Sequence, residues 1–124
     1  MVSYKRIDHV ALHVKDIEAS KAFYESHFGF KTYFEHDTPK GFNIAYLRLE
    51  DTVLELAGYQ DSPVRGFHFC LETDDFDGAV SALTEAGVEI YQEPHKTAAR
   101  APREESWRRV VFEGPDGELI ELRG

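Results

Sequence analysis

The segments IDHVALHV (residues 7–14) and FHFCLE (residues 67–72) are two copies of one strand pattern, and each carries one histidine, His9 or His68. Both segments are rich in Val, Ile, Leu and Phe, which favours a buried strand. Repetition of this kind indicates a duplicated module that closes on itself or on a partner. We therefore expect two related modules, with the two histidines at matched places.

A second pair of segments repeats further along each copy, VLELAG (residues 53–58) and LIELRG (residues 119–124). Each places one glutamate, Glu55 or Glu121, between apolar residues of a predicted strand. A carboxylate in such a place is costly unless it is paired or coordinates a metal. Two modules related by a pseudo-twofold axis would bring matched side chains together, so a metal site is the common explanation. The predicted ligands are His9, Glu55, His68 and Glu121.

The rest of each copy predicts one helix and further strands. Asp16 is placed to cap the first helix and Gly29 to end it. Asp74 or Asp75 would cap the second helix, and Gly87 would end it. The expected elements are a strand over 7–14, a helix over 17–28, strands over 31–36, 42–49 and 52–57, then a strand over 67–72, a helix ending at Gly87, and strands over 88–92, 108–113 and 118–122.

The order of these elements is βαβββ, twice over. It predicts an α+β fold of two tandem modules, about 5–58 and about 66–124, within a single domain over residues 1–124. Residues 58–66 form the expected linker. Residues 93–107 show no clear periodicity, and a loop of this length is usually functional or mobile.

Other side chains could serve the site or have ordinary structural roles. A run of arginines could hold a substrate carboxylate or phosphate, or belong to a solvated loop. His13 shares the strand face of His9, where it could contact substrate, support a ligand, or be a hydrogen-bonded rim histidine. Trp107 could form the wall of a pocket or belong to the core, and Cys70 is interpreted as an inert packed thiol. The arginines are Arg100, Arg103, Arg108 and Arg109.

Length and composition fit a globular protein of one domain. The chain has 124 residues and a net charge of −9, so nucleic acid and anionic membranes are poor partners. Its single cysteine cannot form an intrachain disulfide, which favours a reducing cytoplasm. No run approaches the length of a membrane span, and residues 1–6 contain no apolar signal core. We therefore expect a cytoplasmic protein.

The predicted ligand set defines the chemistry to expect. Imidazole and carboxylate together suit a borderline divalent ion, with zinc or nickel as the first expectation and cobalt, manganese or iron as alternatives. Such an ion polarises a carbonyl and stabilises an enediolate, while a nearby carboxylate moves the proton. Two adjacent oxygens of a small-molecule substrate would complete the coordination.

The chain as a whole resembles the vicinal oxygen chelate superfamily, which includes glyoxalase I, extradiol dioxygenases, fosfomycin-resistance enzymes and bleomycin-binding proteins. The segments that carry the resemblance are IDHVA (7–11), AFY (22–24), FGF (28–30), LEL (54–56), His68 in its strand, and FEGPDGELIEL (112–122), which is the most specific. The resemblance implies paired βαβββ modules whose curved mixed sheets enclose a metal ion.

Within the superfamily, the ligand order His, Glu, His, Glu is similar to that of glyoxalase I. Extradiol dioxygenases and fosfomycin-resistance enzymes generally use His, His and Glu, here His9, His68 and Glu121, and bleomycin-binding members lack the metal. Glu55 therefore favours the glyoxalase-like interpretation. Two positions differ from the glyoxalase pattern, because His13 replaces an arginine that contacts glutathione and the asparagine after the first Glu ligand is absent. The thiol substrate is thus left open.

The resemblance implies a metal-dependent lyase or isomerase of the lactoylglutathione lyase type. It would act on a thiol hemithioacetal, with Glu121 or Glu55 moving the proton. Two alternatives stay open: an extradiol-type dioxygenase, and a small-molecule-binding or antibiotic-resistance protein without turnover. A homodimer is also expected, since this family commonly covers exposed sheet edges by pairing chains. Each metal site would be built within one chain or from two chains.

Overall fold

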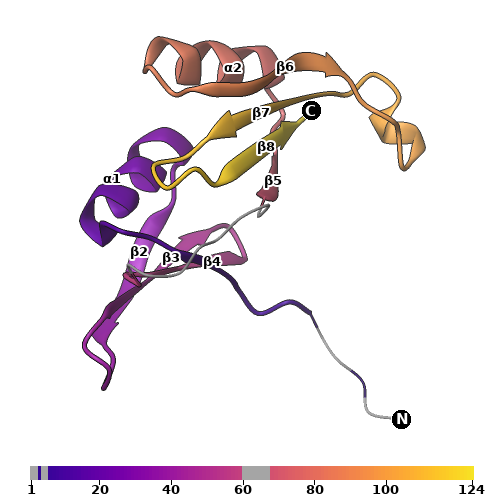
Figure 1. Ribbon diagram of the computed structural model, residues 1–124. Helices are drawn as coiled ribbons and strands as arrows, with labels where there is room; N and C mark the ends of the chain where they lie inside the picture. Colours follow the sequence, from indigo (N-terminus) through magenta and orange to yellow (C-terminus); the bar gives the residue numbers. More distant parts are fainter. Residues whose placement is uncertain (1–2, 4–5, 60–67) are drawn as a thin grey trace. The chain divides into compact units, whose positions relative to one another are not determined.

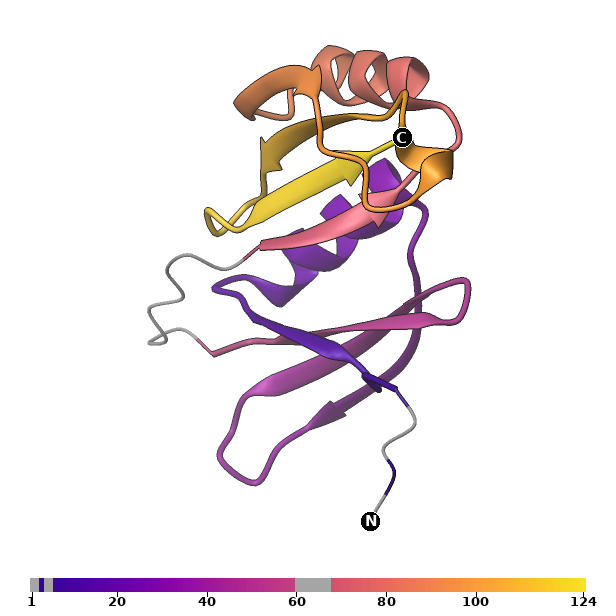
Figure 2. The same ribbon diagram turned by 90° about the vertical axis from the view of Figure 1, so that its right-hand side faces the viewer.

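The computed structural model describes residue 3 and residues 6–59 and 68–124. The chain divides into two compact units, residues 1–64 and 65–124. Each unit contains one four-stranded sheet and one longer helix (Figure 1 and Figure 2). The predicted linker residues 60–66 and the first residue of the predicted strand 67–72 lie outside the described part of the chain.

The first unit has the order strand, helix and three strands. Its sheet has the strand order β1-β4-β3-β2, in which β1 runs parallel to β4 and the other neighbours are antiparallel. The elements are β1 (Val10–His13), α1 (Ile17–Phe28), β2 (Lys31–Asp37), β3 (Asn43–Leu49) and β4 (Thr52–Ala57). This is one complete βαβββ unit.

Local chemistry explains where α1 begins and ends. The Asp16 side chain accepts a hydrogen bond of 3.0 Å from the backbone N–H of Ala19, which caps the first turn. Gly29 ends the helix in the left-handed region with φ 75°, a conformation that suits glycine. Tyr24 of α1 is fully buried, and so are Leu47 of β3 and Leu56 of β4.

The second unit repeats this topology. Its sheet has the order β5-β8-β7-β6, again with one parallel pair, β5 and β8. The elements are β5 (His68–Glu72), α2 (Phe76–Glu85), β6 (Ile90–Lys96), the short 3-10 helix η1 (Pro102–Glu104), β7 (Arg108–Glu113) and β8 (Leu119–Arg123). Asp75, rather than Asp74, caps α2, because its side chain accepts a 3.0 Å hydrogen bond from the N–H of Gly78.

The predicted α+β fold with two βαβββ units is confirmed, and several element bounds differ from the predicted ones, since β6 begins at Ile90 rather than at residue 88 and β8 spans Leu119–Arg123 rather than 118–122. The first strand begins at Val10 and not at residue 7. The predicted loop 93–107 is partly ordered structure, because β6 continues to Lys96 and η1 follows. β6 is an edge strand with bulges in its pairing to β7, so it tolerates Pro94 and shows no apolar alternation.

Each sheet buries one face beneath its own helix and leaves a helix-free face. In the first sheet, Leu54 and Leu56 are buried on the helix side, which places Glu55 on the helix-free face. In the second sheet, Ile120 and Leu122 are buried on the helix side, which places Glu121 on the helix-free face. Among the described residues, no helix is long and apolar enough to span a bilayer.

Candidate metal and proton-transfer site

His9 and Glu55 lie side by side in the first unit. β1 and β4 run in parallel with Ala11 opposite Glu55, so the residue just before β1 comes within reach of that carboxylate. The distance from His9 Nε2 to Glu55 Oε2 is 3.2 Å. The Glu55 side chain is only 13% exposed. The structure thus brings together the predicted pair of the first unit.

The second nitrogen of His9 is held by its neighbour in sequence. His9 Nδ1 lies 3.0 Å from Asp8 Oδ2. This hydrogen bond, followed by the negative charge of Glu55, raises the pKa of His9 against the opposing effect of desolvation. A carboxylate on one ring nitrogen fixes the ring and the tautomer, and leaves the other nitrogen to act as a ligand. Here that other nitrogen is Nε2, which faces Glu55.

Tyr46 is a site residue that sequence reasoning missed. It lies on β3 directly opposite Glu55, and its ring meets the His9 ring edge-on with centroids 6.0 Å apart. Burial, then the charge of Glu55 and a hydrogen bond to it, raise the pKa of the Tyr46 phenol. The His36 ring stacks on the Tyr46 ring with centroids 6.1 Å apart. The pairing register of β3 with β4 was the signal that could have identified Tyr46.

His68 and Glu121 form the matching pair in the second unit. β5 runs parallel to β8, with Cys70 opposite Glu121 and His68 two residues earlier on the same strand face. The distance from His68 Nε2 to Glu121 Oε2 is 3.9 Å. Glu121 is buried, whereas the His68 side chain is 59% exposed. Both units therefore place a His nitrogen beside a mostly buried carboxylate at their parallel strand pair.

Glu121 has a further partner, Arg109 of β7. Arg109 Nε donates a 3.0 Å hydrogen bond to Glu121 Oε1, which leaves Oε2 on the side of His68. A pocket of about 100 Å³ opens beside these groups. Its lining residues are His68, Tyr91, Gln92, Arg109, Val111, Leu119 and Glu121.

Cys70 lies on the same face of the second sheet. The residue is exposed rather than packed, because it stands on the helix-free face opposite Glu121. Desolvation by surrounding atoms, and then the charge of Glu121, raise the pKa of the Cys70 thiol to about 11. The thiol therefore stays protonated at neutral pH and is a poor nucleophile.

The other predicted arginines contact different partners. Arg100 donates from both Nε and Nη2 to the buried carboxylate of Glu104, each at 2.9 Å. Arg103 pairs with Glu72, and its guanidinium lies 4.7 Å from the centroid of the Trp107 ring. The Arg103–Glu72 pair connects the 97–107 segment to β5, whereas the contacts of Arg100 with Glu104 and of Arg103 with Trp107 lie within the segment. The lining of the pocket beside Glu121 does not include Arg100, Arg103 or Trp107.

His13 occupies the far end of β1. It shares the helix-free face with Ala11, and its ring contacts the Tyr59 ring with centroids 5.5 Å apart. Tyr59 in turn meets Phe42 edge-on at 5.3 Å. His13 therefore belongs to an aromatic group at this end of the sheet.

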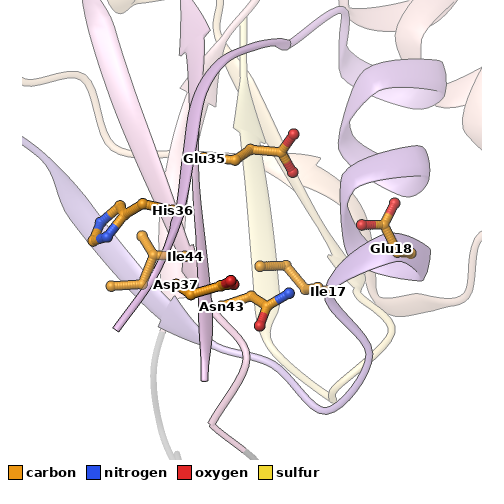
Figure 3. A pocket seen from close by; sticks show the side chains of 7 residues that line it. All are labelled: Ile17, Glu18, Glu35, His36, Asp37, Asn43 and Ile44. Carbon is orange, nitrogen blue, oxygen red and sulfur yellow. The ribbon is translucent and has the colours of Figure 1, made fainter. Parts of the chain in front are cut away.

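A separate pocket of about 270 Å³ in the first unit is rich in carboxylates (Figure 3). Glu35 and Asp37 point to the side of β2 where α1 lies, and His36 points to the opposite side (Figure 3). Lys21 pairs with Glu35 and lies 3.4 Å from Glu18 Oε2. Lys21 thus offsets part of the negative charge of this pocket by contacting two of its three carboxylates.

The donor atoms fit a divalent metal, although each unit supplies them only in pairs. Imidazole nitrogen with carboxylate oxygen is the donor set of borderline ions such as zinc and nickel. Within residues 6–59 and 68–124, no group of three or more His, Cys, Asp and Glu side chains is arranged to hold an ion. The four-residue ligand set stays a prediction.

A duplicated βαβββ unit with one His–Glu pair at the same strand junction in each copy defines the class of protein. The family model of the Glyoxalase/Bleomycin resistance protein/Dioxygenase superfamily matches residues 6–122. The chain belongs to this superfamily. The predicted resemblance to it is thereby confirmed.

Individual relatives extend this result. The uncharacterized protein YwbC of Bacillus subtilis (strain 168) is 34% identical over 126 residues, covering 95% of this chain and 96% of YwbC. The mitochondrial methylmalonyl-CoA epimerase of Bos taurus is 31% identical over 133 residues, covering 94% of this chain and 73% of the epimerase. A solved glyoxalase family protein from Enterococcus faecalis has a TM-score of 0.82 at 24% identity over 98% of each chain, which shows the fold alone.

Proposed function

We propose that this chain is a metal-dependent enzyme that moves a proton at a carbon next to a carbonyl group. One observation carries the proposal: the same His–Glu pair recurs at the parallel strand junction of both units, at 3.2 Å and 3.9 Å. In each pair the carboxylate is largely shielded from water. A shielded carboxylate needs a charged or hydrogen-bonding partner to offset the cost of burial. The ligands in this proposal are His9, Glu55, His68 and Glu121.

The site would hold zinc or nickel first, with cobalt, manganese or iron as alternatives. A bound divalent ion would supply Lewis acidity toward two neighbouring substrate oxygens and so stabilise negative charge at the adjacent carbon. His9 is prepared for this role by Asp8, which occupies Nδ1 and leaves Nε2 free to bind. Arg109 similarly holds one oxygen of Glu121 and fixes the orientation of the carboxylate.

Glu121 is our choice for the group that takes the proton. The arginine-bearing segment supports this choice, because Arg109 contacts Glu121 and could also orient a substrate. In an epimerisation the C–H bond breaks, the proton moves to a carboxylate, and a proton returns to the opposite face of the same carbon. Glu55 is the second candidate, either as the base or as the group that returns the proton.

The first substrate class we propose is an acyl thioester that carries a carboxylate on its α-carbon. Its support is the similarity to the Bos taurus methylmalonyl-CoA epimerase, which extends over 94% of this chain. The thioester carbonyl and the carboxylate offer two oxygens to one ion, and the hydrogen between them is acidified by both groups. The second class is a thiol hemithioacetal, as for lactoylglutathione lyase, and its support is the carboxylate of Glu55 facing His9.

Proton exchange into the substrate tests the proposed reaction. The zinc-loaded protein in D₂O should exchange the α-hydrogen of methylmalonyl-CoA, followed by mass spectrometry, and a methylglyoxal–thiol adduct is assayed in parallel. Glu121→Gln keeps an oxygen ligand but removes the base, so it should retain metal and lose exchange. Glu85→Gln, at the exposed end of α2, is the matched control.

Metal analysis completes the test. His9→Ala and His68→Ala should each lose most of the bound metal, whereas His95→Ala, an exposed histidine on β6, should keep it. An unchanged number of metal ions per chain in both His9→Ala and His68→Ala would refute the ligand assignment. Normal exchange by Glu121→Gln would overturn its role as the base. Oxygen uptake with a catechol would favour the dioxygenase, and ligand binding that ignores chelators would favour a binding protein.

Two further expectations remain proposals of ours: a homodimer and a cytoplasmic location. The homodimer has support in exposed aromatic residues on the edge strands β2 and β6. They are Tyr33, Phe34 and Tyr91, with exposed fractions of 46%, 54% and 64%.

A further inference from the structure

Arg109 has an unused half of its guanidinium beside the proposed base. Arginine has five N–H donors in one plane. In Arg109 the Nε–H donates to Glu121. Among the described residues, none accepts a hydrogen bond from Nη1 or Nη2 of Arg109. By contrast, Arg100 spends both Nε and Nη2 on a single carboxylate. Arg109 therefore keeps an edge that matches a second carboxylate.

The register partners of Arg109 on both neighbouring strands are basic residues and not carboxylates. On β8 its register partner is Arg123, which is cationic and donates to the carbonyl of Ala98 and to Glu104. On β6 its register partner is His95. Glu121 is the carboxylate in the lining of the pocket, and it is shared between Arg109 and His68. Arg109 and Glu121 carry one charge of each sign in this lining, and among the described residues that line the pocket there is no second carboxylate to occupy the free edge of Arg109.

The size of this pocket limits what can enter. About 100 Å³ is well below the roughly 300–1,000 Å³ of pockets that enclose a whole drug-sized ligand. It suits a carboxylate-sized end group, with the rest of the molecule outside. The Arg109 side chain is 28% exposed, so an incoming group can reach it.

We propose that Arg109 binds a carboxylate of the substrate through Nη1 and Nη2, while its Nε holds Glu121 in position for the proton transfer. The ligand class is a small acid whose carboxylate stands next to the reacting carbon. Arg109 would then align the substrate acid with the base Glu121, because one planar guanidinium would hold both carboxylates. The inference rests on the proposed function for the role of Glu121, but not for the binding of the anion.

Malonate is the probe, and malonamide is its neutral counterpart. The zinc-loaded protein is titrated with each by calorimetry, and the Arg109 Nε–H resonance is followed by NMR. Wild type should bind malonate and not malonamide. Arg109→Gln should weaken malonate binding roughly tenfold or more, the loss expected for a charge-assisted hydrogen-bonded pair. Arg108→Gln is the matched control, since Arg108 is next in sequence but pairs with Asp77 on the helix side of the sheet.

Each result decides the inference. Loss of affinity in Arg109→Gln alone, at unchanged zinc content and melting temperature, supports it, and so does a kcat/KM loss that is larger for carboxylate substrates than for substrates without a carboxylate. Wild-type affinity in Arg109→Gln, or no malonate binding by wild type, overturns it. If Arg109→Gln does not fold, Arg109→Lys replaces it, because Lys keeps the charge without the fork; wild-type affinity there also overturns the inference. Arg109-dependent malonate binding without proton exchange would refute the proposed function alone.

Discussion

Arg100 and Arg123 both contact the carboxylate of Glu104, a residue that sequence reasoning did not single out. Glu104 is 3% exposed, accepts from the side chain and the backbone N–H of Arg100, and lies 3.3 Å from Arg123 Nη2. Buried carboxylates of this kind need such partners. For Arg100 the sequence left open a substrate-binding role and a place in a solvated loop, and in the structure its side chain is bonded to Glu104 in the segment before β7.

The pKa of Glu104 predicts a pH dependence of stability. Its hydrogen bonds with Arg100 lower the pKa from 4.5 to about 2 in the folded state. A lowered folded pKa stabilises the protein fully above the unfolded value, and this contribution is lost as the pH falls from about 4.5 to about 2. Urea unfolding at several pH values should show a gap between wild type and Glu104→Gln that narrows across this window. A gap that does not change with pH would contradict the prediction.

At the scale of single elements, both helices begin with an aspartate N-cap. Asp16 and Asp75 each accept a hydrogen bond from the N–H three residues later, at 3.0 Å in both cases. Gly78 at the end of the second bond has no Cβ, and a Cβ there would meet the Asp75 carboxylate. The helix start in the second unit therefore depends on both residues.

Capping at α2 gives a direct comparison of two neighbouring aspartates. Asp75→Ala should lower the free energy of unfolding by about 1 kcal/mol, the usual cost of losing an N-cap. Asp74→Ala removes the same charge without removing the cap, so its effect should stay within about 0.5 kcal/mol. Thermal and urea unfolding of both variants measure the difference. Equal losses in the two variants would show that charge, and not capping, is responsible.

The elements that could be predicted from sequence are those with a local signal. The predicted bounds are correct for α1, β4 and β7. A capped helix and a buried strand with alternating side chains can each be recognised from the local order of apolar, polar and capping residues. β6 extends further than predicted, since it is an exposed edge strand whose length is set by its pairing with β7. Tyr46 and the role of Arg109 depend on cross-strand register, which local pattern does not encode.

At the scale of the whole molecule, the exposed edge strands lead to a prediction about assembly. β2 and β6 carry aromatic residues that are costly to leave in water. We expect a homodimer, and light scattering at micromolar concentration should give twice the mass of the 14.2 kDa chain. A monomer at that concentration would refute the dimer. Phe34→Glu and Tyr91→Glu then identify which edge is used, since the charge should dissociate the dimer only at the edge in contact.

The parallel pairing of the first and last strand in each unit has a consequence for synthesis. Val10 pairs with Leu54, and His68 pairs with Leu119. The first strand of each unit therefore cannot pair with its last strand until nearly the whole unit has left the ribosome. Contacts between residues so distant in sequence close late and slow folding. The His–Glu pairs span these same strands. A nascent chain that ends before Glu55 would therefore lack both pairs, and one that ends between Glu55 and Glu121 would contain the first pair alone.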